Sequence, residues 1–151
     1  MLVPKEWTAS SWGSIDPDGR VWQRSPLDSN YHLVYRFADG ADTAQSLSVF
    51  NMRRWLHSDP KGRVVRAQYW GNRLELAAFD GTKIKFHSVQ VALAPEDVAY
   101  HILLCFDQMD WNGASVPLFW EGIDGTEVHH WTRHFIAHWH ERSLDGILHA
   151  L

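Results

Sequence analysis

The sequence has little of what marks several large protein classes. It contains one cysteine, Cys105, in 151 residues, so it has no internal disulfide framework, no CxxC pair and no zinc-finger spacing. No apolar run approaches the roughly 18–20 residues that a membrane-spanning helix needs. The first residues, Met1–Trp7, lack the charged and then apolar order of an export signal, which predicts a cytoplasmic protein.

An excess of positive charge is also missing. The chain has 14 basic and 18 acidic residues and a net charge of −4, so no global positive field exists to hold a nucleic acid backbone. One region is locally basic and contains a tryptophan, as in surfaces that stack single-stranded bases: it includes Arg53, Arg54, Trp55 and Arg63. The negative charge of the whole chain argues against this use, and neither a nucleic acid nor a membrane is expected as a partner.

Motifs of catalysis are absent as well. There is no Ser-His-Asp order, no Gly-rich phosphate loop and no P-loop. Asp107, Asp110 and Glu121 can form acid–base pairs, but chance pairs are common among 18 acidic residues, so solvated carboxylates are the favoured interpretation. Cys105 lies in an apolar helical stripe, which favours an inert buried thiol. No motif indicates a family, and enzymatic activity stays open.

What the chain does have is an ordinary globular composition with two excesses. Hydrophobic residues make up 45% and charged residues 21%, and no linker or repeat appears, so we expect a single domain over residues 1–151. Nine tryptophans and ten histidines stand out. Most of the tryptophans are expected in the core, and the remainder can line a groove or a partner surface.

Alternating apolar residues predict strands over residues 31–38, 63–70, 73–79, 82–93 and 116–120. Short turns at Gly71-Asn72 and Asp80-Gly81 predict antiparallel neighbours. The apolar phase shifts within residues 82–93, which predicts a β-bulge near His87-Ser88 and a bent strand. Residues 46–57 fit either a strand or a helical turn.

Two helices are expected near the C-terminus. Ala94-Pro95-Glu96-Asp97 has the composition of a helix start, and an apolar stripe follows it to about residue 110. Residues 126–142 read as a second helix, with Val128, Trp131 and Phe135 on one face. The predicted fold is therefore α+β: a strongly curved antiparallel sheet, or a partly open barrel, with the two C-terminal helices packed on it.

The second predicted helix carries histidines at i, i+4 and i+8, namely His130, His134 and His138. Two histidines one helical turn apart can share a zinc or nickel ion, so His130 and His134 are the candidate metal ligands. The segment lacks the Glu that follows the first His in metalloproteases, because Trp131 follows His130. The alternative is a boundary stripe of rings stacked on neighbouring aromatic residues, with no cofactor.

The order His138-Trp139-His140 matches the His-hydrophobic-His string that rolling-circle nucleases place on a strand. On the helix predicted here, the two histidines would point about 200° apart. The prediction of a helix therefore argues against a shared metal ion at this string.

Two functions of different classes follow. The first is a non-enzymatic binding or regulatory module, in which a Trp-rich surface serves a protein partner or a homodimer. Its candidate contact residues lie in segments read as loops or as uncertain: Trp12, Trp22, Trp55 and Trp111. The second is a small-molecule-binding or catalytic pocket lined by Trp and His. Its candidate residues are His101, Glu121, Trp131 and His134.

Overall fold

The computed structural model describes residues 2–4, 23–27, 31–35, 47–58 and 61–142. The chain divides into two compact units, residues 1–58 and 59–151. A single domain over residues 1–151 therefore stays a prediction. No helix in the described ranges is both long enough and apolar enough to cross a membrane.

The first unit contains a small sheet and one helix. Strands β1 (Leu2–Pro4), β2 (Gln23–Pro26) and β3 (Tyr31–Tyr35) form an antiparallel sheet in the order β1-β3-β2. The ambiguous segment is helix α1 (Leu47–His57), which buries Val49, Met52 and Trp55. The spacing of these three residues matches one face of a helix, which resolves the ambiguity.

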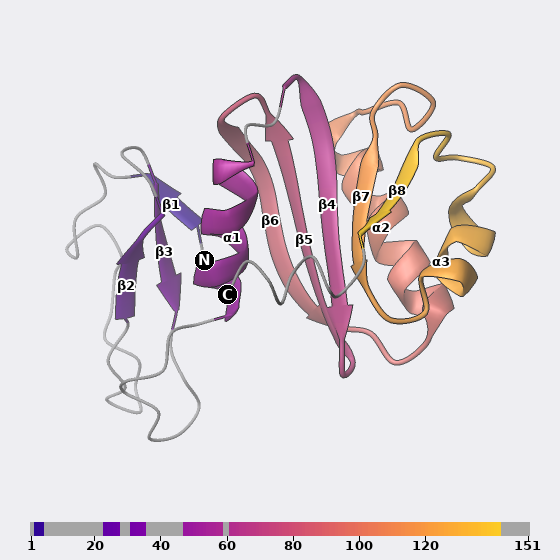
Figure 1. Ribbon diagram of the computed structural model, residues 1–151, viewed down its shortest axis with the longest axis horizontal. Coiled ribbons are helices and arrows are strands. Elements are labelled where there is room, and N and C mark those ends of the chain that lie inside the picture. The colour runs from indigo at the N-terminus through magenta and orange to yellow at the C-terminus, as the bar shows by residue number, and fades with distance from the viewer. Residues whose placement is uncertain (1, 5–22, 28–30, 36–46, 59–60, 143–151) are drawn as a thin grey trace. The chain divides into compact units, whose positions relative to one another are not determined.

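The second unit is built around a five-stranded sheet (Figure 1). The elements follow the order β4 (Arg63–Trp70), β5 (Arg73–Asp80), β6 (Lys83–Val91), α2 (Pro95–Met109), β7 (Leu118–Gly122), α3 (Gly125–Thr132) and β8 (Trp139–Arg142). The strand order in space is β6-β5-β4-β7-β8. Strands β4, β5 and β6 are antiparallel neighbours, whereas β7 pairs in parallel with β4, and β8 in parallel with β7.

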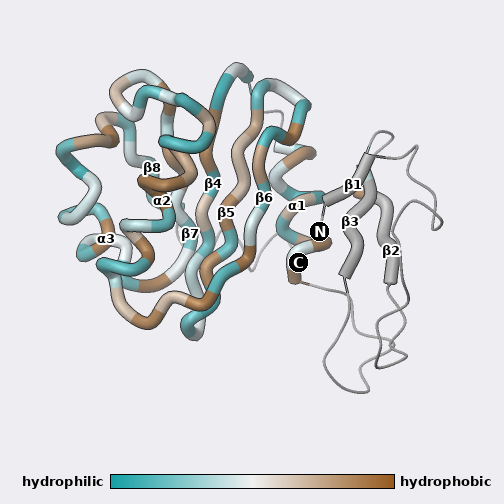
Figure 2. The backbone as a smooth tube through the Cα atoms, turned by 180° about the vertical axis from the view of Figure 1, so that it is seen from behind, coloured by the Kyte–Doolittle hydropathy of each residue, from teal (hydrophilic) through white to brown (hydrophobic). Residues whose placement is uncertain are grey.

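The three predicted strands between residues 63 and 93 and the helix after them are confirmed. Asn72 and Gly71 both adopt positive φ in the β4–β5 turn, which is the chemistry that the dipeptide predicted. Pro95 opens α2, and Glu96 and Asp97 lie in its first turn, where the helix dipole favours carboxylates. Figure 2 shows apolar residues along β4, β5 and β6 and on α2, and hydrophilic residues over much of α3.

The core of the second unit lies between the sheet and the two helices. It joins one face of β4, β5 and β7 to the buried stripe of α2 and to Val128 of α3. Tyr69, Leu76 and Trp120 are among the strand residues on this face. Since side chains alternate along a strand, the residues between them point to the opposite face.

Several details of the predicted sheet were wrong. The sheet is mixed rather than antiparallel and is not closed, so the curved or barrel-like shape is not confirmed. The irregularity in the β5–β6 pairing falls between Ala78 and Phe79, where Phe86 and Ile84 are the partners, so the extra residue is Lys85 and not His87 or Ser88. The strand expected over residues 116–120 is β7, two residues further along.

The predicted helix over residues 126–142 was also wrong beyond its first half. Helix α3 ends at Thr132, whose hydroxyl donates a hydrogen bond to the Val128 carbonyl oxygen (3.1 Å). The N–H groups of Phe135 and Ile136 both bond to the Thr132 carbonyl, which forms a turn. The chain then enters β8, because Ile136 is buried and the Ala137 N–H bonds to the Gly113 carbonyl (3.0 Å).

Candidate functional site

The strand order creates a topological switch point between β4 and β7. The connections from β4 run through β5 to β6 on one side, and β7 and β8 lie on the other side (Figure 1). Strands β4, β7 and β8 run parallel, so their carboxyl ends lie at the same edge of the sheet. In open α/β sheets, ligands bind outside the carboxyl ends of the strands at such a point.

The face of this sheet that lies opposite α2 and α3 is here called the second sheet face. It is unusually polar for the middle of a sheet. The register places Glu75, Gln68, Glu121 and Arg142 side by side on β5, β4, β7 and β8. Glu75, Gln68 and Glu121 are all buried, at 0%, 3% and 1% exposure. Buried carboxylates require bonded partners, so the contacts of this row determine what it can do.

Glu75 has partners on both of its carboxylate oxygens. Both terminal nitrogens of Arg73 donate to its Oε2 (3.1 Å each), and the His87 ring nitrogen Nε2 lies 2.8 Å from its Oε1. Arg73 keeps 30% of its side chain exposed, whereas the His87 side chain is 6% exposed. The arrangement holds one buried negative charge between a guanidinium and an imidazole.

Gln68 and Glu121 meet at the switch point itself. The Gln68 side-chain Nε2 donates to Glu121 Oε2 at 3.5 Å, which is a long hydrogen bond across the β4–β7 pair. The residue after Glu121 is Gly122, which has a φ of +136°. A Cβ atom there would overlap the Tyr69 carbonyl oxygen, so only glycine lets the two strand ends approach this closely.

Tyr69 marks the carboxyl end of β4 on the helix-covered face. Its hydroxyl donates a hydrogen bond to the Ala92 carbonyl oxygen (3.0 Å). Burial raises the pKa of Tyr69, and the nearby carboxylates of Asp124 and Asp97 raise it further. The hydroxyl therefore stays protonated and acts as a fixed donor that ties β4 to the end of β6.

A second row on the second sheet face combines cations with an aromatic ring. The register places Arg66, Phe119 and His140 side by side on β4, β7 and β8. The His140 ring stacks on Phe119 with centroids 4.9 Å apart, and the Arg66 guanidinium carbon lies 4.9 Å from the Phe119 centroid. The Arg142 guanidinium carbon is 5.8 Å from the same ring. These distances are within the range of cation–π attraction.

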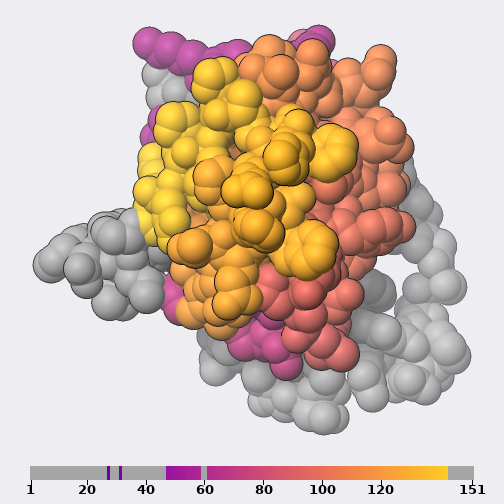
Figure 3. Space-filling model, turned by 90° about the vertical axis from the view of Figure 1, so that its right-hand side faces the viewer, coloured from indigo at the N-terminus to yellow at the C-terminus, as the bar shows by residue number. Residues whose placement is uncertain are grey.

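Two large aromatic side chains are exposed on α3 and the turn after it, the region coloured orange to yellow at the front of Figure 3. Trp131 is 50% exposed and Phe135 is 62% exposed. A Cβ atom on Gly113 would overlap the Phe135 carbonyl oxygen, so this turn packs tightly on the loop before β7. The backbone that carries Phe135 is therefore held from both sides, by Thr132 and by Gly113. We call this region the α3 surface.

Behind the α3 surface, an aromatic stack joins α3 to the sheet. Trp139 stacks on Trp120 with centroids 5.3 Å apart and on His129 with centroids 4.9 Å apart. The Trp120 ring also lies beside the Tyr69 ring, with centroids 6.3 Å apart. The stack explains why the segment after α3 returns as a strand, since Trp139 finds its partners there.

The residues predicted for a small-molecule pocket lie on different elements of the second unit. Glu121 lies on the second sheet face, whereas Trp131 and His134 belong to the exposed end of the unit around α3. His101 is half-buried on α2, with its ring edge against Tyr100 (5.4 Å). Of these four residues, Glu121 is the one that lies at the switch point, on the face away from α2 and α3, and a pocket formed by the others stays a prediction.

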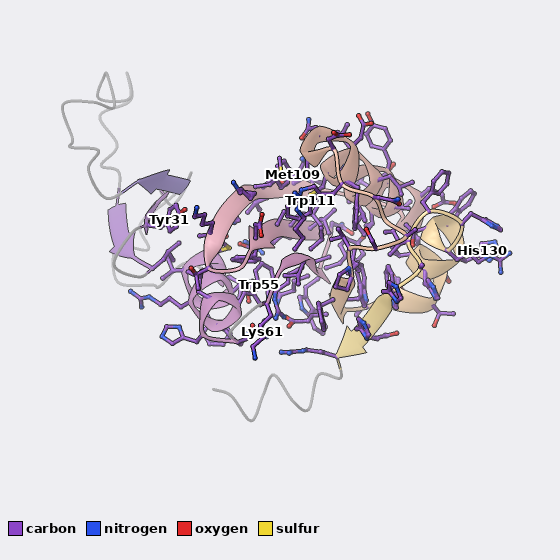
Figure 4. The ribbon with its side chains drawn as sticks, turned by 90° about the horizontal axis from the view of Figure 1, so that it is seen from above. Tyr31, Trp55, Lys61, Met109, Trp111 and His130 are labelled. Carbon is purple, nitrogen blue, oxygen red and sulfur yellow. The ribbon has the colours of Figure 1, made fainter. Side chains whose placement is uncertain are left out.

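The long helix predicted around the metal pair does not form. His130 lies on α3 and His134 lies in the turn after it, where Arg133 still has helical φ and ψ, so the pair itself stays a prediction. Figure 4 shows His130 pointing outward from α3. Within the described ranges, no group of three or more His, Cys, Asp or Glu side chains is placed to hold a metal ion.

The four tryptophans predicted for partner contact lie in different environments or outside the described residues. Trp12 and Trp22 lie outside the described residues. Trp55 is fully buried on α1. Trp111 is half-buried against the core of the second unit, with the Arg63 guanidinium carbon 5.6 Å from its ring (Figure 4). The exposed tryptophan of the described part is instead Trp131, which the sequence had suggested for a pocket.

Sequence reasoning missed the polar rows. Arg66, Gln68 and Glu75 interrupt the otherwise apolar middle of their strands, and this interruption was the available signal. A charged residue at every second position of an apolar strand indicates a polar face. The partners of that face come from β7 and β8, which the strand pattern alone does not bring to β4.

Cys105 has the properties predicted for an inert thiol. It is 1% exposed, and burial raises its pKa from 9.0 to about 12. We expect the native protein to react slowly with a disulfide reagent, and the reaction to reach the rate of a free thiol only in denaturant. Rapid modification of the native protein would contradict this prediction.

The free energy of unfolding of the protein should fall as the pH rises from 9.0 towards about 12, because the Cys105 thiol ionises first in the unfolded chain.

Comparisons with known proteins identify the fold. No family model matches the chain, and no curated protein matches it. A crystal structure from Bacteroides thetaiotaomicron VPI-5482, described as a protein with an actin-like ATPase fold and unknown function, superposes with a TM-score of 0.78 at 12% identity. It covers 94% of this chain, and the chain spans 64% of its length. At this identity the similarity shows the fold alone.

A second structure, Pelota from Archaeoglobus fulgidus, superposes with a TM-score of 0.40 at 4% identity, over 81% of this chain and 39% of that one. This score is too low to define a shared fold. The similarity to the Bacteroides structure therefore describes the fold alone, and the function has to be argued from the residues.

Proposed function

We propose that this protein is a non-enzymatic binding module and that its contact surface is the α3 surface. The observation that carries the proposal is the exposure of Trp131 (50%) and Phe135 (62%) on a backbone held by the Thr132 and Gly113 hydrogen bonds. Large aromatic side chains on a fixed backbone lose little conformational entropy on binding, and they are enriched at the centres of protein interfaces.

The charge of this surface favours a second copy of the chain as the partner. Residues 125–137, from the start of α3 through the turn after it, contain one acidic and one basic residue, a formal charge of 1 − 1 = 0, whereas the whole chain carries −4. Two copies of this segment can meet without net repulsion while their histidines are neutral. A symmetric pair would place the aromatic side chains of both copies in one contact.

Sedimentation velocity over a range of protein concentrations tests the proposal. We expect the sedimentation coefficient of the native chain to rise with concentration, and the variant Trp131→Ser/Phe135→Ser to weaken association by about tenfold or more. The matched control is Leu93→Ser/Tyr100→Ser, which removes side chains of 72% and 62% exposure elsewhere in the second unit. A native chain that stays monomeric, or a control that loses association equally, would contradict the proposal.

A second candidate function is a small-molecule site at the carboxyl ends of β4 and β7. The buried row of Glu75, Gln68 and Glu121 at a topological switch point supports it, as does the actin-like ATPase fold of the structural neighbour. Calorimetric titration with ATP, with and without magnesium, tests it. Binding that Glu121→Gln abolishes would support this function, and an absence of heat would remove it.

A further inference from the structure

The edge strand β8 presents two polar side chains to the second sheet face. His140 pairs in register with Phe119, and Arg142 pairs with Glu121, so both share that face. Both are exposed, whereas Phe119 is half-buried and Arg66 is buried at 3% exposure. The second row therefore changes from a buried interior at β4 to an open edge at β8.

Positive charge gathers around one ring at this open edge. The Arg66 and Arg142 guanidinium carbons lie 4.9 and 5.8 Å from the Phe119 centroid, and the His140 imidazole stacks on that ring. The Arg142 guanidinium and the His140 imidazole are the exposed groups of this cluster. A bound anion would add charge-assisted hydrogen bonds to the Arg142 guanidinium.

Arg142 has donors available for such an anion. In the part of the chain that the structure describes, Arg142 makes no ion pair, and its contact is the face of the Phe119 ring. Glu121, its neighbour in register, is buried at 1% exposure and receives a hydrogen bond from Gln68. A guanidinium presents five N–H groups in a fixed fork, which fits the oxygens of a phosphate or a carboxylate.

We propose that Arg142 and His140 form an oxyanion-binding site at the exposed edge of the second sheet face, positioned by Phe119 and Arg66. Arg142 supplies a bidentate contact, and the His140 ring nitrogens supply a donor beside it. Phe119 orients the His140 ring by stacking and lies under the Arg142 guanidinium, which lowers the entropy lost on binding. The ligand is a group that carries two or more anionic oxygens, either a phosphate or a carboxylate.

Titration of the full chain with inorganic phosphate and, separately, with succinate tests the site and distinguishes the two sources of oxygen. Binding is followed by calorimetry and by chemical shifts of the His140 ring. We expect Arg142→Gln to weaken binding of the preferred anion about tenfold. The matched control is Arg133→Gln, an exposed arginine in the turn after α3, which should change affinity less than about twofold.

Three outcomes would overturn the site: no binding of either anion, equal losses in the two arginine variants, or binding that leaves the His140 signals unchanged. Circular dichroism and thermal melting check that Arg142→Gln folds, and His140→Gln gives a second variant on the same edge. Neither substitution touches Trp131 or Phe135, so self-association should be unchanged. Failure of this site is therefore distinguishable from failure of the proposed binding surface.

Discussion

Replacing Gly122 with alanine is expected to lower the free energy of unfolding by about 3 kcal/mol or more. Gly122 has a φ of +136°, a conformation that residues with a Cβ atom rarely adopt. The added Cβ would also overlap the backbone carbonyl of Tyr69, which cannot move without disturbing β4. Because Gly122 pairs with Tyr69 in the parallel β4–β7 contact, the change opens the sheet at the switch point.

The matched control for this variant is Gly81→Ala. Gly81 also has a positive φ, +58°, but a Cβ atom there meets no atom within 4 Å. We expect this control to lose only about 1 kcal/mol, which is the cost of the backbone conformation alone. Urea unfolding curves with equal slopes give both values. Equal losses in the two variants would show that the close approach of β7 to β4 contributes nothing.

The middle of the fold could be predicted because its signals are local. Strands β4, β5 and β6 follow one another through two short turns, and Gly71-Asn72 and Asp80-Gly81 carry the residues that such turns require. Pro95 marks the start of α2 in the same way. In each case the residues that determine the structure lie within a few positions of one another.

The final segment could not be predicted because its local signal favours the wrong structure. Val128, Trp131 and Phe135 have helical spacing, so residues 126–142 read as one helix. What ends the helix lies elsewhere in the chain, because Gly113 bonds to Ala137, and Trp120 stacks on Trp139. Tertiary contacts of this kind override a periodic pattern.

The parallel pairing of β7 with β4 could not be predicted either, because it also depends on contacts between distant parts of the chain. Residues 118–122 look alike whether they pair in parallel or antiparallel, since only the side-chain period is visible in the sequence. Gln68 and Glu121 are 53 positions apart, yet they lie side by side once the helical connection has returned the chain to β4. The sequence therefore indicated Glu121 as a candidate ligand-binding residue, but it did not indicate that Gln68 lies beside it.

The predicted directions of the His138 and His140 side chains were also wrong, because they assumed that residues 126–142 form one helix. In a helix, His138 and His140 would point about 200° apart, but in an extended chain residues two positions apart share a side. His140 consequently faces Phe119 rather than the α3 side of the sheet. The secondary structure of this short segment thus decides which chemistry its residues can take part in.

Replacing Glu75 with glutamine is expected to cost about 3 kcal/mol of stability, the range found when one member of a buried ion pair is removed. The Glu75 carboxylate accepts hydrogen bonds from Arg73 on one oxygen and lies 2.8 Å from the His87 ring nitrogen on the other. Glutamine keeps the shape but has one accepting oxygen and no charge, so the Arg73 guanidinium loses its counter-charge beside a fully buried position.

The control for this change is Glu127→Gln, which removes the charge of an exposed carboxylate on α3 and should alter stability by less than about 0.5 kcal/mol. A double-mutant cycle with Arg73→Gln separates the contribution of the Arg73–Glu75 ion pair from that of the other contacts of Glu75. If the pair accounts for the loss, the double variant should be less destabilised than the sum of the two single variants. Losses that add independently would mean that Glu75 is held by its other contacts, and that the second sheet face owes its stability to packing rather than to charge.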